Sequence, residues 1–250
     1  MIRTQNLTKC FGALKAVDDL TLQISPGELF AFLGPNAAGK TTTIKLLAGL
    51  LRPTSGSCSI GGHDLQREPE AAKRLIAYVP DFPFLYEKLT CAEFMRFVGD
   101  MFEVAPAEIP LRTGALFERF GLDPFRHELT ENLSHGTRQR LVIASALLHD
   151  PKVLVIDEPM VGLDPMHTRI VKDVLKERSR AGTTIFLSTH QLGVAEELAD
   201  RIGIIGQGRL IALGTLEDLR RKSSGAQELE RIFLDLTEAG EEAVEAAAHP

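Results

Sequence analysis

One stretch of this chain, residues 29–51, restricts the possible folds more than any other. It begins with an apolar run, LFAFL at Leu29–Leu33, which has the length and composition of a buried β-strand. The next eight residues, Gly34–Thr41, read GPNAAGKT and fit the pattern G-x-x-x-x-G-K-[ST]. Apolar residues then recur, mostly at helical spacing, between Ile44 and Leu51. A strand, a glycine-containing loop and a helix in this order predict a phosphate-binding loop, or P-loop.

The P-loop has a direct chemical meaning. Unpaired N–H groups of the loop and of the first helical turn point at one spot and favour an anion there. Lys40 would supply positive charge to the β- and γ-phosphates of a nucleoside triphosphate, and Thr41 would offer a hydroxyl oxygen to Mg²⁺. The loop alone does not distinguish a kinase, a GTPase, a motor and a transporter ATPase. The residues expected to hold the triphosphate are Gly34, Pro35, Asn36, Ala37, Ala38, Gly39, Lys40, Thr41 and Thr42.

Size and composition limit the possible partners. The chain has 250 residues, enough for one large domain or two small ones. Its net charge is −6 with both signs interspersed, so no basic face indicates nucleic acid. Cys10, Cys58 and Cys91 show no C-x-x-C spacing, which suits a reducing cytoplasm. The N-terminus lacks the apolar core of a signal peptide, and no stretch approaches the ~18 apolar residues that cross a bilayer. In a membrane process, another chain would have to span the membrane.

Strand and helix signals divide the chain into three parts. Alternating apolar residues at Ile2–Leu7 and Val17–Ile24 predict half-buried strands, with Phe11 in the turn between them. Residues 88–148 are mostly helical in pattern, and Thr90 with Glu93 resembles a capping box. Further apolar runs alternate with helices, which favours a mostly parallel sheet. The predicted fold is α/β: a mostly parallel central sheet flanked by helices, an N-terminal antiparallel β subdomain and an inserted α-helical subdomain.

Four features lie where predicted strands end: the P-loop after Leu33, Asp81 after Val79, the pair Asp157-Glu158 after Ile156, and His190 after Leu187. Ligands of such sheets bind at the carboxyl ends of the strands, so these features can face one site. We expect Asp157 to hold Mg²⁺, Glu158 to polarise an attacking water and His190 to reach a γ-phosphate. The plain alternatives are an acidic turn between a strand and a helix for the pair, and a structural role for His190.

Three segments resemble the ATP-binding subunits of ATP-binding-cassette (ABC) transporters. Residues 133–140 read LSHGTRQR, similar to the family signature LSGGQ-x-[QR]-R. Gly162–Pro165 matches the D-loop of the family, and Ser188–His190 matches its H-switch. The motifs occur in the family order within residues 1–238. The resemblance therefore implies that residues 1–238 form one ATPase domain. A P-loop kinase has neither the signature nor the H-switch.

The resemblance implies a mechanism that the residues alone do not show. Two cassettes would pair head to tail, with each ATP between the P-loop of one and the signature of the other. Phe11 would stack on adenine, and Asp164 would belong to the D-loop. Motion would pass to separate transmembrane permease subunits through the loop after Asp81. The signature residues expected to contact ATP in trans are Leu133, Ser134, His135, Gly136 and Thr137.

Several positions depart from the common family pattern. Asp81 replaces a glutamine that joins Mg²⁺ and the γ-phosphate, so we hypothesise altered metal dependence or coupling. His135 replaces the first signature glycine, Thr137 the glutamine, and Ala37 a frequent P-loop glycine. Asp81, His135 and the pair Leu85-Tyr86 are more similar to subfamilies with export-type permeases than to nutrient importers.

Three aromatic residues, Phe82, Phe84 and Tyr86, lie in the loop after Asp81. They either pack inward as a local cluster or form an exposed patch for a partner such as a permease. The resulting hypothesis is a cytoplasmic ATPase, peripheral on the inner face of the membrane, that drives export. The alternative is a soluble, non-transport ABC ATPase acting on ribosomes or DNA. Residues 239–250, acidic and rich in alanine, are expected to be disordered.

Overall fold

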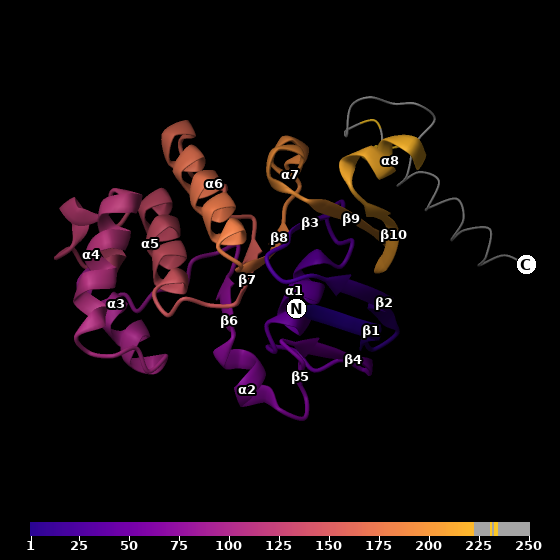
Figure 1. Cartoon of the computed structure of the whole chain (residues 1–250), viewed down its shortest axis with the longest axis horizontal. Coiled ribbons are helices and arrows are strands. Elements are labelled where there is room, and N and C mark those ends of the chain that lie inside the picture. Colours follow the sequence, from indigo (N-terminus) through magenta and orange to yellow (C-terminus); the bar gives the residue numbers. More distant parts are fainter. Residues whose placement is uncertain (223–230, 232, 235–250) are drawn as a thin grey trace, which may run out of the picture.

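Two β-sheets form the centre of the computed structural model, which describes residues 1–222, 231, 233 and 234 (Figure 1). The smaller sheet is antiparallel, in the order β2-β1-β4-β5. Its strands are β1 (Ile2–Phe11), β2 (Leu14–Ile24), β4 (Ser55–Ile60) and β5 (His63–Asp64). The larger sheet has six strands in the order β10-β9-β3-β8-β7-β6 and is parallel except for its β9–β10 hairpin. Its strands are β3 (Leu29–Leu33), β6 (Ile76–Val79), β7 (Val153–Asp157), β8 (Thr184–Ser188), β9 (Arg201–Gly206) and β10 (Arg209–Gly214).

Helices cover the larger sheet and extend to one side of it (Figure 1). Helices α3, α4 and α5 lie together beyond β6 and β7, at the far end from the antiparallel sheet. Short 3₁₀ turns at Asp123–Phe125 and Thr130–Asn132 connect α4 to α5. The helices are α1 (Lys40–Leu47), α2 (Pro69–Arg74), α3 (Cys91–Met101), α4 (Glu108–Phe120), α5 (His135–Leu147), α6 (Pro165–Arg180), α7 (Leu192–Leu198) and α8 (Leu216–Lys222).

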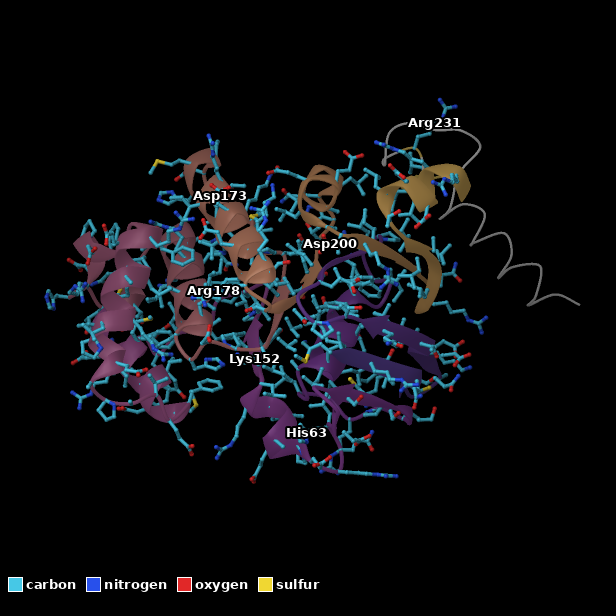
Figure 2. The ribbon with its side chains drawn as sticks, viewed as in Figure 1. His63, Lys152, Asp173, Arg178, Asp200 and Arg231 are labelled. Atoms are coloured by element: carbon cyan, nitrogen blue, oxygen red, sulfur yellow. The ribbon has the colours of Figure 1, made fainter. Side chains whose placement is uncertain are left out.

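The larger sheet is buried on both faces because its strands are apolar at consecutive positions. Val153 and Val155 of β7 belong to the core shared with α1 and the antiparallel sheet. Leu154 and Ile156 belong to the opposite core, shared with α5 and α6. This alternation follows from the two-residue period of a strand. Side chains from neighbouring loops also bond to the sheet. Asp200, labelled in Figure 2, accepts a hydrogen bond of 2.8 Å from the N–H of Leu29 at the start of β3.

The predicted fold class is confirmed, with some local differences. Thr90 and Glu93 form the expected capping box at the start of α3. Phe11 does not lie in a turn, because β1 and β2 continue to a tight connection at Gly12. Helix α2 was not predicted, since its six residues are too few to show a periodic pattern. No helix in the described part of the chain is long and apolar enough to cross a membrane. The 1–238 domain boundary stays a prediction, and the predicted tail, 239–250, lies outside the described residues.

His149 gives the fold a pH dependence that can be measured. Its ring stacks on Phe102, with 3.8 Å between the ring centroids and 8° between the planes. Burial lowers the pKa of His149 below 6.5. Above pH 6.5 the ring is neutral in both the folded and the unfolded chain, and the free energy of unfolding has its full value. As the pH falls from 6.5 through the lowered pKa, the unfolded chain binds a proton that the folded chain does not, and the free energy of unfolding decreases.

We therefore expect His149→Phe to flatten the loss of thermal stability between pH 7 and pH 5. The melting temperature of both chains across this range is the measurement. The matched control is His127→Phe, because His127 is exposed. Equal slopes for wild type and His149→Phe would contradict the assignment.

Candidate functional site

A cavity of about 770 Å³ lies at the carboxyl ends of β3, β6, β7 and β8. Residues from several of the predicted motifs line it, although they are far apart in the sequence. Its walls are formed by Phe11, Leu14, Lys15, Ala16, Asn36, Ala37, Gly39, Lys40, Thr41, Thr42, Asp81, Asp157, Glu158, His190, Gln207 and Gly208. A separate, smaller cavity is lined in part by Gly34, Pro35, Asn36 and His190.

The P-loop follows a path that requires small residues. A methyl group on Gly34 would lie 2.5 Å from the Ile205 carbonyl oxygen, and one on Gly39 would lie 2.4 Å from that of Ala16. Gly39 also has φ 107°, a left-handed conformation that favours glycine. Ala37 has φ 63° without being glycine, at the position where the family often has one. The loop is thus held in a strained path with its N–H groups at the start of α1.

Lys40 begins α1 and is 9% exposed. Its ammonium group donates hydrogen bonds to the carbonyl oxygens of Gly34, at 2.6 Å, and Pro35, at 2.9 Å. Burial lowers the pKa of Lys40, and the nearby carboxylates of Glu158 and Asp157 oppose this effect. A partly desolvated cation at the pocket wall attracts an anion more strongly than a solvated one.

Asp157 ends β7 and is 2% exposed. Its Oδ2 lies 3.3 Å from the Thr41 hydroxyl, so the side chains from the P-loop helix and from β7 meet. Burial is the main cause that raises the pKa of Asp157, the carboxylates of Asp81 and Glu158 add to it, and the hydrogen bond from the Thr41 hydroxyl opposes it. Excess negative charge in a buried place favours a cation beside Asp157.

Glu158 is held in place by the end of β8. Its backbone has φ 47°, uncommon for a residue other than glycine, and its N–H donates to the Ser188 carbonyl at 2.9 Å. The carboxylate accepts hydrogen bonds from the Thr189 hydroxyl, at 3.1 Å, and from the His190 N–H, at 2.9 Å. His190 Nδ1 lies 2.7 Å from the same carboxylate. A carboxylate only accepts, so Nδ1 carries the hydrogen and Nε2 is the free position.

Asp81 and Phe11 both line the cavity wall. The Phe82 N–H donates to Asp81 Oδ1 at 2.8 Å, which fixes the carboxylate at its loop. Phe11 is 49% exposed at the end of β1, and the Lys9 ammonium lies 5.1 Å from its ring centroid. An exposed aromatic face at a pocket edge can stack on a planar base.

The signature residues do not line this cavity in the described part of the chain. Ser134 is the N-cap of α5 and accepts a hydrogen bond of 3.3 Å from the Thr137 N–H. Leu133 and Thr137 are buried. Asp164 caps α6, where its Oδ1 accepts from the His167 N–H at 2.9 Å. The start of α5 lies against the D-loop, because a methyl group on Gly136 would be 2.8 Å from the Gly162 carbonyl oxygen.

Sequence reasoning missed the β9–β10 turn at the cavity. The Gly208 N–H donates to the Ala38 carbonyl at 2.9 Å, and the Gly208 carbonyl accepts from the Asp18 N–H at 2.9 Å. Arg209 also pairs with Asp18 at 2.6 Å. The turn therefore connects the P-loop to β2. A glycine after Gln207 predicts a turn, but no local pattern shows that the turn packs on a loop some 170 residues earlier in the chain.

Comparison with known proteins places this geometry in a family. The sequence model of the family described as "ABC transporter" matches residues 17–161. The linearmycin resistance ATP-binding protein LnrL of Bacillus subtilis is 34% identical over the whole chain and 80% of its own length. The Nod factor export ATP-binding protein I of Cupriavidus metallidurans is 37% identical over 92% of this chain and 76% of its own length.

A solved structure agrees with these relatives. The structure described as that of an ATP-binding subunit of an ABC transporter is 35% identical and superposes with a TM-score of 0.91, covering 95% of this chain and 99% of that one. Family, relatives and fold point the same way. The chain belongs to the ABC transporter family and is one of its ATP-binding, ATP-hydrolysing subunits.

Proposed function

We propose that this chain drives export as one of two cassettes that close around two ATP molecules, with permease subunits supplying the path through the membrane. The observation that supports the proposal is that, among the residues the structure describes, those of the signature do not line the cavity that contains the P-loop. We refer to this arrangement as a divided site. The cavity holds the P-loop, Glu158 and His190, whereas the signature helix starts outside the cavity walls. A second cassette is needed to bring a signature to the bound nucleotide.

Within one cassette, each side chain has a chemical role. The P-loop N–H groups and Lys40 would bind the phosphates, Thr42 would lie at the same phosphates, and Phe11 would stack on the adenine. Glu158 would accept the proton of the attacking water, because its carboxylate faces the cavity and is anchored from behind. His190, through Nε2, would donate a hydrogen bond to the γ-phosphate or orient the water.

Mg²⁺ fits the oxygen donors of Thr41 and Asp157, with Asp81 in the same cavity wall. Among the described residues no group of three or more His, Cys, Asp or Glu side chains could hold a metal ion. This agrees with the usual binding of Mg²⁺ by one or two carboxylates together with phosphate oxygens and water. When bound, the ion neutralises phosphate charge.

In the pair, Ser134 and the N–H groups at the start of α5 would contact the γ-phosphate bound by the other cassette. A thirteen-residue helix gives this end a partial positive charge that favours the anion. Leu133 and Thr137 would fix the turn from inside, and His135 and Gly136 would lie on its exposed side. Asp164 would hold the D-loop at the same interface.

The aromatic loop, residues 82–86, would contact the permease. Phe82, Phe84 and Tyr86 are 58%, 78% and 60% exposed, and Phe97 and Met101 of α3 add apolar surface. Contiguous exposed apolar residues indicate a partner surface. Two matching relatives are named for drug resistance or export, which supports export for this chain. The cassette would then be a peripheral protein on the cytoplasmic face.

The function is tested first by Glu158→Gln. We expect kcat for ATP to fall at least about 100-fold, the range for loss of a general base, with ATP binding retained. Steady-state ATPase assays and binding of a fluorescent ATP analogue are the measurements. Glu118→Gln, an exposed change on α4, is the matched control. Normal turnover in Glu158→Gln would exclude Glu158 as the base.

The divided site is tested by mixing two inactive chains. Ser134→Arg and Lys40→Ala should each abolish turnover. In their mixture, the Ser134→Arg P-loop can pair with the Lys40→Ala signature. Because half of the dimers are mixed and each has one intact site of two, we expect roughly a quarter of wild-type ATPase activity. A mixture as inactive as its components would contradict a site shared between two cassettes.

Asp81→Gln tests the contribution of the third carboxylate to Mg²⁺. Loss of about 1 kcal/mol of attraction should raise the half-saturating Mg²⁺ concentration about fivefold. Titration of ATPase activity with Mg²⁺ measures this, with Asp173→Asn, a change at an exposed position of α6, as control. Identical Mg²⁺ curves would show that Asp81 is not near the ion.

A further inference from the structure

His135 connects the aromatic loop to the turn that comes after Glu158. Its ring lies edge-on to that of Phe82, with 6.4 Å between the centroids and 62° between the planes. On the other side it lies against Gly162, because a methyl group on Gly162 would be 2.2 Å from His135 Nδ1 and 2.8 Å from Cε1. The imidazole thus fills the space between two segments that are 80 residues apart in the sequence.

Phe82 and Gly162 are each only a few residues away from a residue that lines the ATP cavity. The Phe82 N–H holds the carboxylate of Asp81, which lines the cavity. Gly162 lies four residues after Glu158, and the Val161 N–H between them donates to the Glu158 carbonyl at 3.2 Å. A shift of Phe82 can therefore reach the backbone of Glu158 through one side chain. A glycine at position 135, common in the family signature, would leave this space empty.

We propose that His135 is a positioning residue: it holds the Gly162 turn in place relative to the aromatic loop, so that displacement of the loop changes the rate of ATP hydrolysis at Glu158. This rests on the proposed function. Phe82, His135 and Gly162 should then be energetically coupled, and double-mutant cycles measure such coupling.

The first cycle combines Gly162→Ala with His135→Ala. Gly162→Ala has two effects, because the added methyl group meets the imidazole and φ is 75°. Only the first effect disappears when His135 is alanine. We expect Gly162→Ala to lower kcat at least about tenfold in the wild-type chain and no more than about threefold in the His135→Ala chain, with KM for ATP unchanged. His135→Gly provides a second background if His135→Ala folds poorly.

Gly62→Ala is the matched control for backbone strain. Gly62 has φ 92° and no heavy atom within 4 Å of an added methyl group. Its effect on kcat should be the same in both backgrounds.

The second cycle combines Phe82→Ala with His135→Ala. We expect each change to lower kcat and the double variant to lose no more than the worse single variant. Tyr86→Ala is the control, because Tyr86 packs on Phe97 with 4.9 Å between the ring centroids. Its effect should multiply with that of His135→Ala. Melting temperatures measured in parallel separate positioning from folding, because a purely structural role would give the coupling in stability and none in kcat.

Effects on kcat that simply multiply in both cycles would overturn the proposal, and so would coupling seen in melting temperature alone. In either case, the proposed function would still hold if the wild-type chain hydrolyses ATP and the Glu158→Gln variant does not. Absence of turnover in the wild type would instead refute the proposed function itself.

Discussion

The parallel pairing of β3, β8, β7 and β6 is the constraint on which the site depends. Parallel strands end at the same edge, so the loops after these strands meet in one place although they are distant in the sequence. The register pairs Asp157 with Ser188, and the loop after Ser188 then supplies the groups that hold Glu158. Backbone hydrogen bonding in the sheet, more than any single side chain, sets the distance between Glu158 and the P-loop.

Strained backbone at three points of the cavity wall shows where precise positioning was favoured over local stability. Glu158, Ala37 and Gln207 adopt positive φ without being glycine, and all three line the cavity. Such residues persist only where the surroundings hold them, here the Ser188 carbonyl for Glu158 and the neighbouring Gly39–Ala16 contact for the loop. Strain of this kind at a cavity wall fits a group that must be aimed in one direction.

Much of the fold could be predicted from sequence because its strands are strongly apolar and its loops carry defined motifs. The strands Leu29–Leu33 and Val153–Asp157 are buried at every position, and the sequence shows a continuous apolar run over Leu29–Leu33 and over Val153–Ile156. The capping box at Thr90 was visible because capping is local chemistry. The Gly208 contact with Ala38 and the wedge of His135 against Gly162 were not, since they depend on how distant segments pack. Phe11 was misplaced in a turn because a tight hairpin with continuing strands and a longer loop leave similar patterns.

A site divided between two cassettes, as proposed, would have a kinetic consequence. Under the proposed function a single copy would bind ATP but lack the signature that completes the site, so turnover would rise with the square of the concentration while copies are dilute. Copies that have not assembled with their partners would then hold nucleotide without consuming it. A permease that brings two cassettes side by side replaces that dependence with a fixed local concentration. ATP hydrolysis would then be confined to the assembled transporter complex, because only there do two cassettes lie side by side.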